Sequence, residues 1–182
     1  MDYRKKLISK LDKMDEALEE LFANLAKFNN EQLNKSPEEG VWSPIQLLNH
    51  MTLSEKLSLA YCRKKLSFDP KLKNKNLRSW FNARLITWSL ASPFKFKAPA
   101  PVREGEFNAN GSLQESEKLW KAIRKDLRQF LNEVPEKYIE KEVYKHPNGL
   151  RLSLEGMLDF LNQHFKRHRK QMYQRLPATQ EI

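Results

Sequence analysis

The chain lacks the features of several protein classes. It has one cysteine, Cys62, so no internal disulfide can form and a reducing compartment is indicated. No apolar run approaches the roughly 18 residues that a membrane span needs. The first 20 residues are charged throughout and contain no apolar segment typical of a signal peptide. We therefore expect a cytoplasmic protein with no membrane partner.

Glycine is also scarce, with five residues among 182, whereas leucine and charged residues are abundant. This composition favours an all-α protein, and the length fits a single domain over residues 1–182. The formal net charge is +10, but lysine and arginine occur in every segment and alternate with 23 acidic residues. Because no zinc-finger spacing, basic region or RNA-binding strand accompanies them, we expect solvated helix surface and no nucleic-acid partner.

Apolar residues that alternate three and four apart predict helices along most of the chain. Four long helices are predicted over residues 2–28, 44–66, 113–132 and 154–172, and a shorter one over residues 77–90. The start at residue 44 is the best defined. Ser43 suits the cap, Pro44 suits the first helical position, and Gln46 completes a capping box.

Each of these helices can bury its apolar stripe only against another helix, which predicts a four-helix bundle. The stripe of helix 44–66 is read as Leu47, His50, Ser54, Leu57 and Tyr61, and that of helix 77–90 as Leu77, Trp80, Phe81, Arg84, Leu85 and Trp88. The proline-rich residues 92–103 cannot form a helix. They are expected to belong to a long crossover that also carries the shorter helix, an arrangement that suits neighbouring helices running in parallel.

His164 and His168 lie four residues apart in the last helix, so both imidazoles fall on one face, on or beside the apolar stripe. The basic residues between Lys166 and Lys170 occupy the other side and could attract an anionic substrate. The pair alone is compatible with core imidazoles and with a metal site. His50 adds a third imidazole on another helix, and three imidazoles with one open position are typical of a catalytic metal centre. This hypothesis requires that His50 lie at the same height in the bundle.

Four segments, taken in order, resemble the DinB/YfiT-like superfamily over nearly the whole chain. They are WSPIQLLNH at 42–50, KFKAP at 95–99, HPNG at 146–149 and HFKRHRKQ at 164–171. The resemblance implies a four-helix bundle, often a homodimer, that binds a divalent metal, typically zinc or nickel, through three histidines. The matching positions here are His50, His164 and His168.

Some members of that superfamily transfer small thiols such as bacillithiol, mycothiol or glutathione, and others are described as metal-dependent hydrolases. The resemblance therefore implies a small-molecule substrate, which can be a low-molecular-weight thiol, and a metal that activates water or that thiol. The main alternative is a non-catalytic binding or interaction protein whose metal stabilises the bundle, and a weaker one is a nucleic-acid binder that relies on the net charge of +10. The sequence has no GxSxG, CxxC, HExxH or Gly-rich phosphate loop that would select a reaction, so no catalytic residue is identified.

Two glutamines are candidates to support the imidazoles, whereas Cys62 and His146 are not expected to belong to the site. The glutamines are Gln171, one turn beyond His168, and Gln46, one turn before His50, although capping alone accounts for Gln46. Cys62 is expected to be a small buried apolar residue rather than a nucleophile. His146 falls in a predicted turn, where we expect it to be exposed and outside the site.

Overall fold

The computed structural model describes residues 2–91 and 111–177. Regular structure within these ranges is almost entirely helical, which confirms the predicted all-α class. The elements in chain order are α1 (Tyr3–Leu25), α2 (Asn30–Asn34), α3 (Pro44–Leu66), α4 (Leu77–Ala91), α5 (Leu113–Glu133), α6 (Glu136–Ile139), β1 (Tyr144–Lys145), β2 (Arg151–Leu152) and α7 (Leu154–Tyr173). All five predicted helices are observed, and their ends lie close to the predicted ones.

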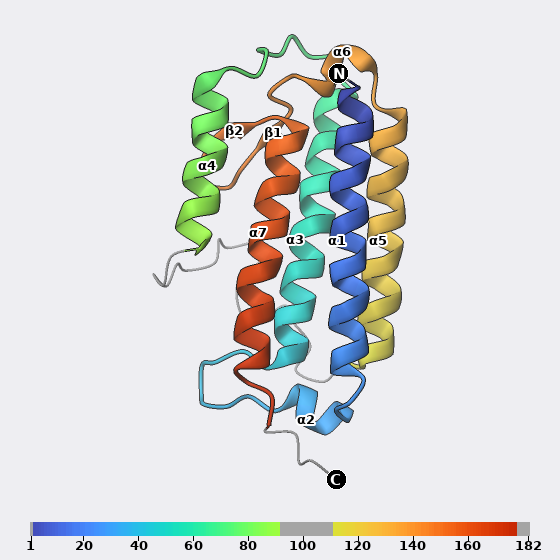
Figure 1. Ribbon diagram of the computed structural model, residues 1–182, viewed down its shortest axis with the longest axis vertical. Coiled ribbons are helices and arrows are strands. Elements are labelled where there is room, and N and C mark those ends of the chain that lie inside the picture. The colour runs from blue at the N-terminus through green and yellow to red at the C-terminus, as the bar shows by residue number, and fades with distance from the viewer. Residues whose placement is uncertain (1, 92–110, 178–182) are drawn as a thin grey trace.

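The long helices α1, α3, α5 and α7 stand side by side as a four-helix bundle, and α4 lies outside the bundle against α7 (Figure 1). α1 and α7 run in one direction, whereas α3 and α5 run in the other. α3 and α5 pack against each other, so the bundle contains the predicted parallel neighbours. The proline-rich residues 92–103 lie outside the described residues.

The start of α3 follows from a capping box. The Ser43 hydroxyl accepts a hydrogen bond from the backbone N–H of Gln46 at 3.2 Å, and the Gln46 side-chain oxygen accepts one from the Ser43 N–H at 2.8 Å. Pro44 occupies the first helical position, where its missing N–H costs nothing. Gln46 therefore acts as a cap, and the helix start fixes the rotation of α3 that carries His50 inward.

Two apolar clusters fill the interior of the bundle from end to end. One of them contains Met51 and Phe165, which directly follow His50 and His164 in the sequence. Trp120 of α5 packs edge-on against Phe165, with ring centroids 5.9 Å apart. Apolar packing therefore joins α3, α5 and α7 immediately beside the histidines.

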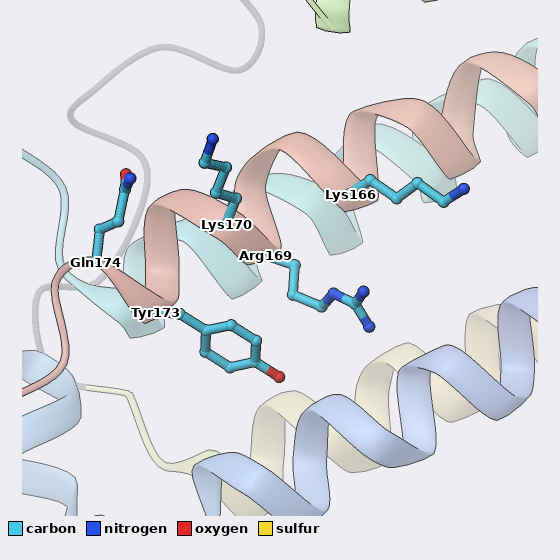
Figure 2. A pocket seen from close by; sticks show the side chains of 5 residues that line it. All are labelled: Lys166, Arg169, Lys170, Tyr173 and Gln174. Carbon is cyan, nitrogen blue, oxygen red and sulfur yellow. The ribbon is translucent and has the colours of Figure 1, made fainter. Parts of the chain in front are cut away.

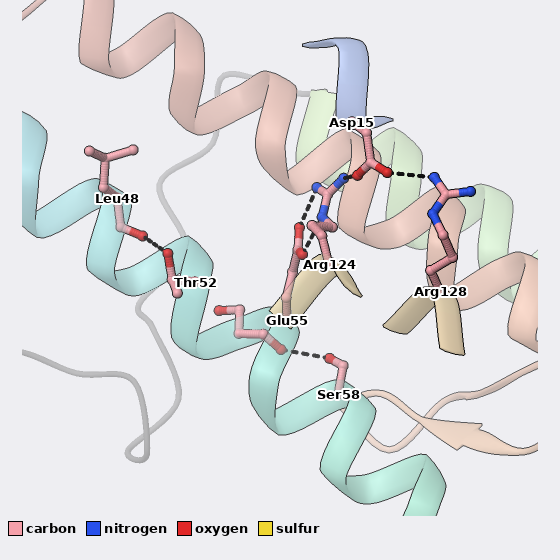
Figure 3. A network of polar contacts seen from close by, with 8 residues as sticks. Asp15, Leu48, Thr52, Glu55, Ser58, Arg124 and Arg128 are labelled. Carbon is pink, nitrogen blue, oxygen red and sulfur yellow. Dashed lines mark hydrogen bonds and ion pairs between the residues drawn. The ribbon is translucent and has the colours of Figure 1, made fainter. Parts of the chain in front are cut away.

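A buried ion-pair network joins α3 to α1 and α5 (Figure 3). The Arg124 guanidinium donates to both carboxylate oxygens of Glu55, at 2.6 and 2.7 Å, and to Asp15 at 3.0 Å. Asp15 also accepts a hydrogen bond from Arg128 at 2.6 Å. Arg124 and Glu55 are 4% and 3% exposed, so this bidentate contact is shielded from water. The bidentate contact can form only when α3 and α5 have one particular position along the bundle axis relative to each other. It therefore also fixes the position of His50 along that axis.

A short antiparallel pair, β1 and β2, precedes α7 and pairs Tyr144 with Leu152. The turn predicted at 146–149 connects the two strands, and Gly149 has a φ of +92°, which favours glycine. The Tyr144 hydroxyl lies 3.0 Å from the Ser58 hydroxyl of α3, which attaches the hairpin to the bundle. No helix in the described ranges is long and apolar enough to cross a bilayer.

Candidate metal centre

Three imidazoles meet between α3 and α7, at the end of the bundle where α3 begins and α7 ends. The Nε2 atom of His164 lies 3.1 Å from Nε2 of His50 and 2.9 Å from Nε2 of His168. His50 and His164 are buried, and His168 is partly exposed at the edge of the group. The height match that the three-histidine hypothesis requires is therefore observed.

Aromatic neighbours hold two of the rings in place. Phe160 of α7 stacks on His164, with ring centroids 5.6 Å apart and an interplanar angle of 21°. Trp42, just before α3, lies against His50 with ring centroids 4.9 Å apart. These contacts restrict the rotation of each imidazole, so that its Nε2 atom points toward the other two.

The donor set suits a divalent metal ion. Tetrahedral ligands at 2.0–2.1 Å from zinc are about 3.3 Å apart, close to the observed separations of the Nε2 atoms. Nδ1 of His168 lies 2.8 Å from the side-chain oxygen of Gln171, which can only accept, so Nδ1 carries the proton. The Nε2 lone pair of His168 is then directed at the centre, as metal binding requires. Gln171 thus supports an imidazole, as suggested from its position one turn beyond His168.

Burial keeps at least two of these imidazoles neutral. It lowers the pKa of His168 to about 3, and repulsion from His50 acts in the same direction, while the bond to Gln171 opposes it. Burial, followed by repulsion from His168 and His50, also holds the pKa of His164 well below its ordinary value. Neutral imidazole is the form that binds metal, so no proton has to be displaced from either ring at neutral pH.

The prediction that His146 is exposed is wrong, because its side chain is partly buried, although it is not one of the three clustered imidazoles. The β1–β2 hairpin places its ring edge-on against Phe160, with centroids 4.6 Å apart, and Phe160 in turn stacks on His164. Burial lowers the pKa of His146, and its charge is among the causes that lower the pKa of His164. A turn that appears isolated in the sequence is folded back onto α7, because β2 leads directly into that helix.

Three of the four basic residues between Lys166 and Lys170 face away from the histidines. Lys166, Arg169 and Lys170 line a shallow surface pocket of about 410 Å³ together with Tyr173 and Gln174 (Figure 2). Lys166 is displaced around the helix by about 160° from both His164 and His168. Arg169 pairs with Glu20 of α1 at 3.2 Å. This pocket therefore opens on the opposite side of α7, and its lysines do not line the trihistidine centre.

Two other cations lie near the imidazoles. The charge of Arg167 on α7 is among the causes that lower the pKa of His164 and His168. Arg175, two residues beyond the end of α7, donates to the Trp42 carbonyl at 2.7 Å. Arg175 is half-buried, which lowers its pKa, and its charge is among the causes that lower the pKa of His168. Within the described ranges it has no carboxylate partner. Arg175 was not identified from the sequence, because it lies beyond the last turn of α7, where helical spacing no longer fixes the direction of a side chain.

The family comparison agrees with this geometry. The sequence profile of the DinB superfamily matches residues 10–172, a range that includes all three histidines of the centre. No curated protein and no solved structure matches the chain. The profile match covers most of the 182 residues, and the helical bundle is the fold expected of that superfamily. The chain therefore belongs to the DinB superfamily.

Proposed function

We propose that this protein is a metal-dependent enzyme that holds zinc or nickel through His50, His164 and His168 and acts as a hydrolase or a thiol S-transferase. The observation that carries the proposal is the convergence of three Nε2 atoms, 2.9 and 3.1 Å from the central one, between two buried helix faces. Three protein ligands leave one position of a tetrahedral ion for water or substrate. Closed structural sites, by contrast, use four protein ligands.

The chain's residues provide the orientation that such chemistry needs. A divalent ion held by three imidazoles supplies Lewis-acid activation of water or of a thiol. His168, partly exposed, stands at the side from which a substrate can approach. Gln171 keeps the ring of His168 in the ligating tautomer, and Phe160 and Trp42 exclude water from the other sides of the centre.

Arg175 favours a substrate with a negative charge. Its guanidinium has five N–H donors, and one hydrogen bond, to the Trp42 carbonyl, is found in the described part of the chain. A planar guanidinium without a carboxylate partner suits bidentate binding of a carboxylate or phosphate. A low-molecular-weight thiol that carries carboxylates combines this requirement with a sulfur for the metal.

The first experiment is metal analysis of the purified full chain together with two variants. We expect about one zinc or nickel ion per chain in the wild type and in His146→Ala, and little metal in His168→Ala. The His146 variant is the matched control, because this imidazole is half-buried beside the centre but is not one of the three ligands. Equal metal content in all three proteins would contradict the ligand assignment.

The second experiment is an activity screen of the metal-loaded protein. Thiols are offered with electrophilic acceptors, and simple esters and amides are offered with water alone. We expect turnover that chelation abolishes, and a higher KM for a carboxylate-bearing thiol in Arg175→Gln than in the control Arg169→Gln, which lies on the opposite side of α7. Stoichiometric metal without any turnover would instead favour a non-catalytic protein whose metal stabilises the bundle. A homodimeric state belongs to the same proposal, and light scattering tests it.

A further inference from the structure

The helix outside the bundle, α4, packs against it through Ser79, Ala83 and Ile86. Ser79 and Ile86 are buried, and Ala83 approaches α7 at Gly156, where an added Cβ would lie 3.4 Å from the Ala83 Cβ. A close approach of this kind leaves no room for large side chains between α4 and α7. The large residues of α4 therefore project away from the bundle.

The projecting side chains form a continuous apolar stripe, here termed the α4 outer face. Its members are 44% to 85% exposed, namely Leu77, Trp80, Phe81, Leu85 and Trp88. With about 150–250 Å² for each fully exposed aromatic side chain, the α4 outer face leaves on the order of 500 Å² of apolar surface in water. The largest apolar patch on a typical monomer is of this size and is often functional.

The positive charge of the chain is concentrated in the section of the sequence that contains α4. Residues 56–103 contain twelve lysines and arginines but one acidic residue, Asp69, whereas the rest of the chain contains 21 basic and 22 acidic residues. Basic residues do occur in every segment, as the sequence analysis noted, but acidic residues are almost missing from this one. The net charge of +10 therefore originates in the section that contains α4.

The positive charge borders the α4 outer face itself. The Arg84 guanidinium lies over the ring of Trp80, 5.2 Å from its centroid. Beside this pair is a groove of about 580 Å³ with no acidic side chain among its lining residues, which are Phe81, Arg84, Leu85, Thr87, Trp88 and, from α7, Gln163. An occupant of this face must therefore offer apolar contacts together with negative charge.

We propose that the α4 outer face binds the surface of an anionic lipid bilayer. A helix with Trp, Phe and Leu on one face and basic residues at its border is the pattern that lies in the interface between headgroups and acyl chains, where tryptophan is enriched. α4 has 15 residues, about 22 Å, and stands at the periphery of the bundle, so its whole length can contact a flat surface (Figure 1). The expectation of no membrane partner rested on the absence of a spanning segment, which this mode of binding does not need.

Two other occupants fit the α4 outer face less well. A second copy of this chain would bring Arg84, and a groove without acidic side chains, against their own equivalents, which like-charge repulsion opposes. A single-stranded nucleic acid would use the aromatic rings, but Leu77 and Leu85 have no flat face on which a base can stack. An anionic bilayer accommodates leucine and aromatic side chains alike.

The test is flotation of the full-length protein with vesicles of phosphatidylcholine alone or mixed with phosphatidylglycerol. We expect binding to the anionic vesicles, a weaker association in high salt and a blue shift of tryptophan emission. The double variant Phe81→Ala with Trp88→Ala should have an affinity for the anionic vesicles that is lower by about tenfold or more. Leu119→Ala on α5, which removes a 49% exposed apolar residue elsewhere, should bind like the wild type.

Three results would overturn the proposal. One is equal binding, or no binding, to both kinds of vesicle. Another is a dimer in light scattering that the double variant converts to a monomer, because the occupant is then a second copy. The third is tighter binding to a single-stranded oligonucleotide than to the anionic vesicles, lost in the double variant, because the occupant is then a nucleic acid. Circular dichroism of the variants provides the folding control, and both substituted side chains are more than half exposed, so the fold should persist.

Discussion

The metal-free protein is expected to lose stability as the pH falls below 7, because buried imidazoles must take up protons on unfolding. Burial lowers the pKa of His168 to about 3, and burial together with repulsion from His168 and His50 lowers the pKa of His164 well below its ordinary value. In the unfolded chain both titrate near pH 6.5. The lowered pKa values therefore contribute stability that is present above pH 6.5 and is lost as the pH falls toward the folded values.

The size of this loss follows from the two pKa values of each imidazole. Between pH 7.5 and 5.5, each histidine should reduce the free energy of unfolding by about 1.4 kcal/mol, and His164 and His168 together by about 2.7 kcal/mol. His146, whose pKa burial also lowers, acts in the same direction. Exposed carboxylates titrate near pH 4 and stay ionised over most of this window.

The assay is urea unfolding of the chelator-treated protein at pH 7.5, 6.5 and 5.5. Over this range the wild type should lose about 1.4 kcal/mol more than His168→Asn, which lacks one of the titrating groups. A free energy of unfolding that stays constant from pH 7.5 to 5.5 would refute the burial of neutral imidazoles. Saturation with zinc should raise the free energy of unfolding at both pH 7.5 and pH 5.5, because His164 and His168 stay neutral in the folded protein over this range.

Three further substitutions test other contacts. Gln171→Leu should weaken metal binding about 10- to 100-fold, because the Nδ1–H of His168 loses its acceptor. Competition with a coloured chelator measures this affinity, and the control Gln174→Leu should leave it unchanged. Arg124→Met should lower the free energy of unfolding by about 3–5 kcal/mol in urea, because Glu55 is left buried without its main partner; a loss below about 1 kcal/mol would contradict that burial. Ser43→Ala should cost about 1 kcal/mol in the same assay, and an unchanged midpoint would show that the cap is dispensable.

Local patterns in the sequence were sufficient for the helices and for the histidine face. The capping box at Ser43 and the spacing of His164 and His168 depend on neighbours within one turn, which sequence alone displays. Burial that depends on distant partners was not predictable in this way. Leu57 was read into the stripe of its helix but is 42% exposed, whereas Glu55 is buried because Arg124, 69 residues away, neutralises it.

The stripe predicted for residues 77–90 shows the same limit. α4 has two faces with helical spacing, and the sequence favours the one with the larger side chains, Trp80 and Trp88 among them. The structure buries the smaller face, because Gly156 on α7 permits the close approach of Ala83. Which face is covered depends on the shape of a helix that follows much later in the chain, and hydrophobic periodicity carries no information on that shape.

The distance along the chain between His50 and His164, 114 residues, has a consequence for the unfolded protein. An ion shared by these imidazoles would tie together two points that otherwise diffuse apart in the unfolded chain, as a disulfide does around a large loop. For a loop of about 100 residues such a tie is worth about 4–5 kcal/mol in chain entropy. With a single thiol, Cys62, buried against Met157, this chain has no covalent equivalent, and chelation would undo the tie without breaking a bond.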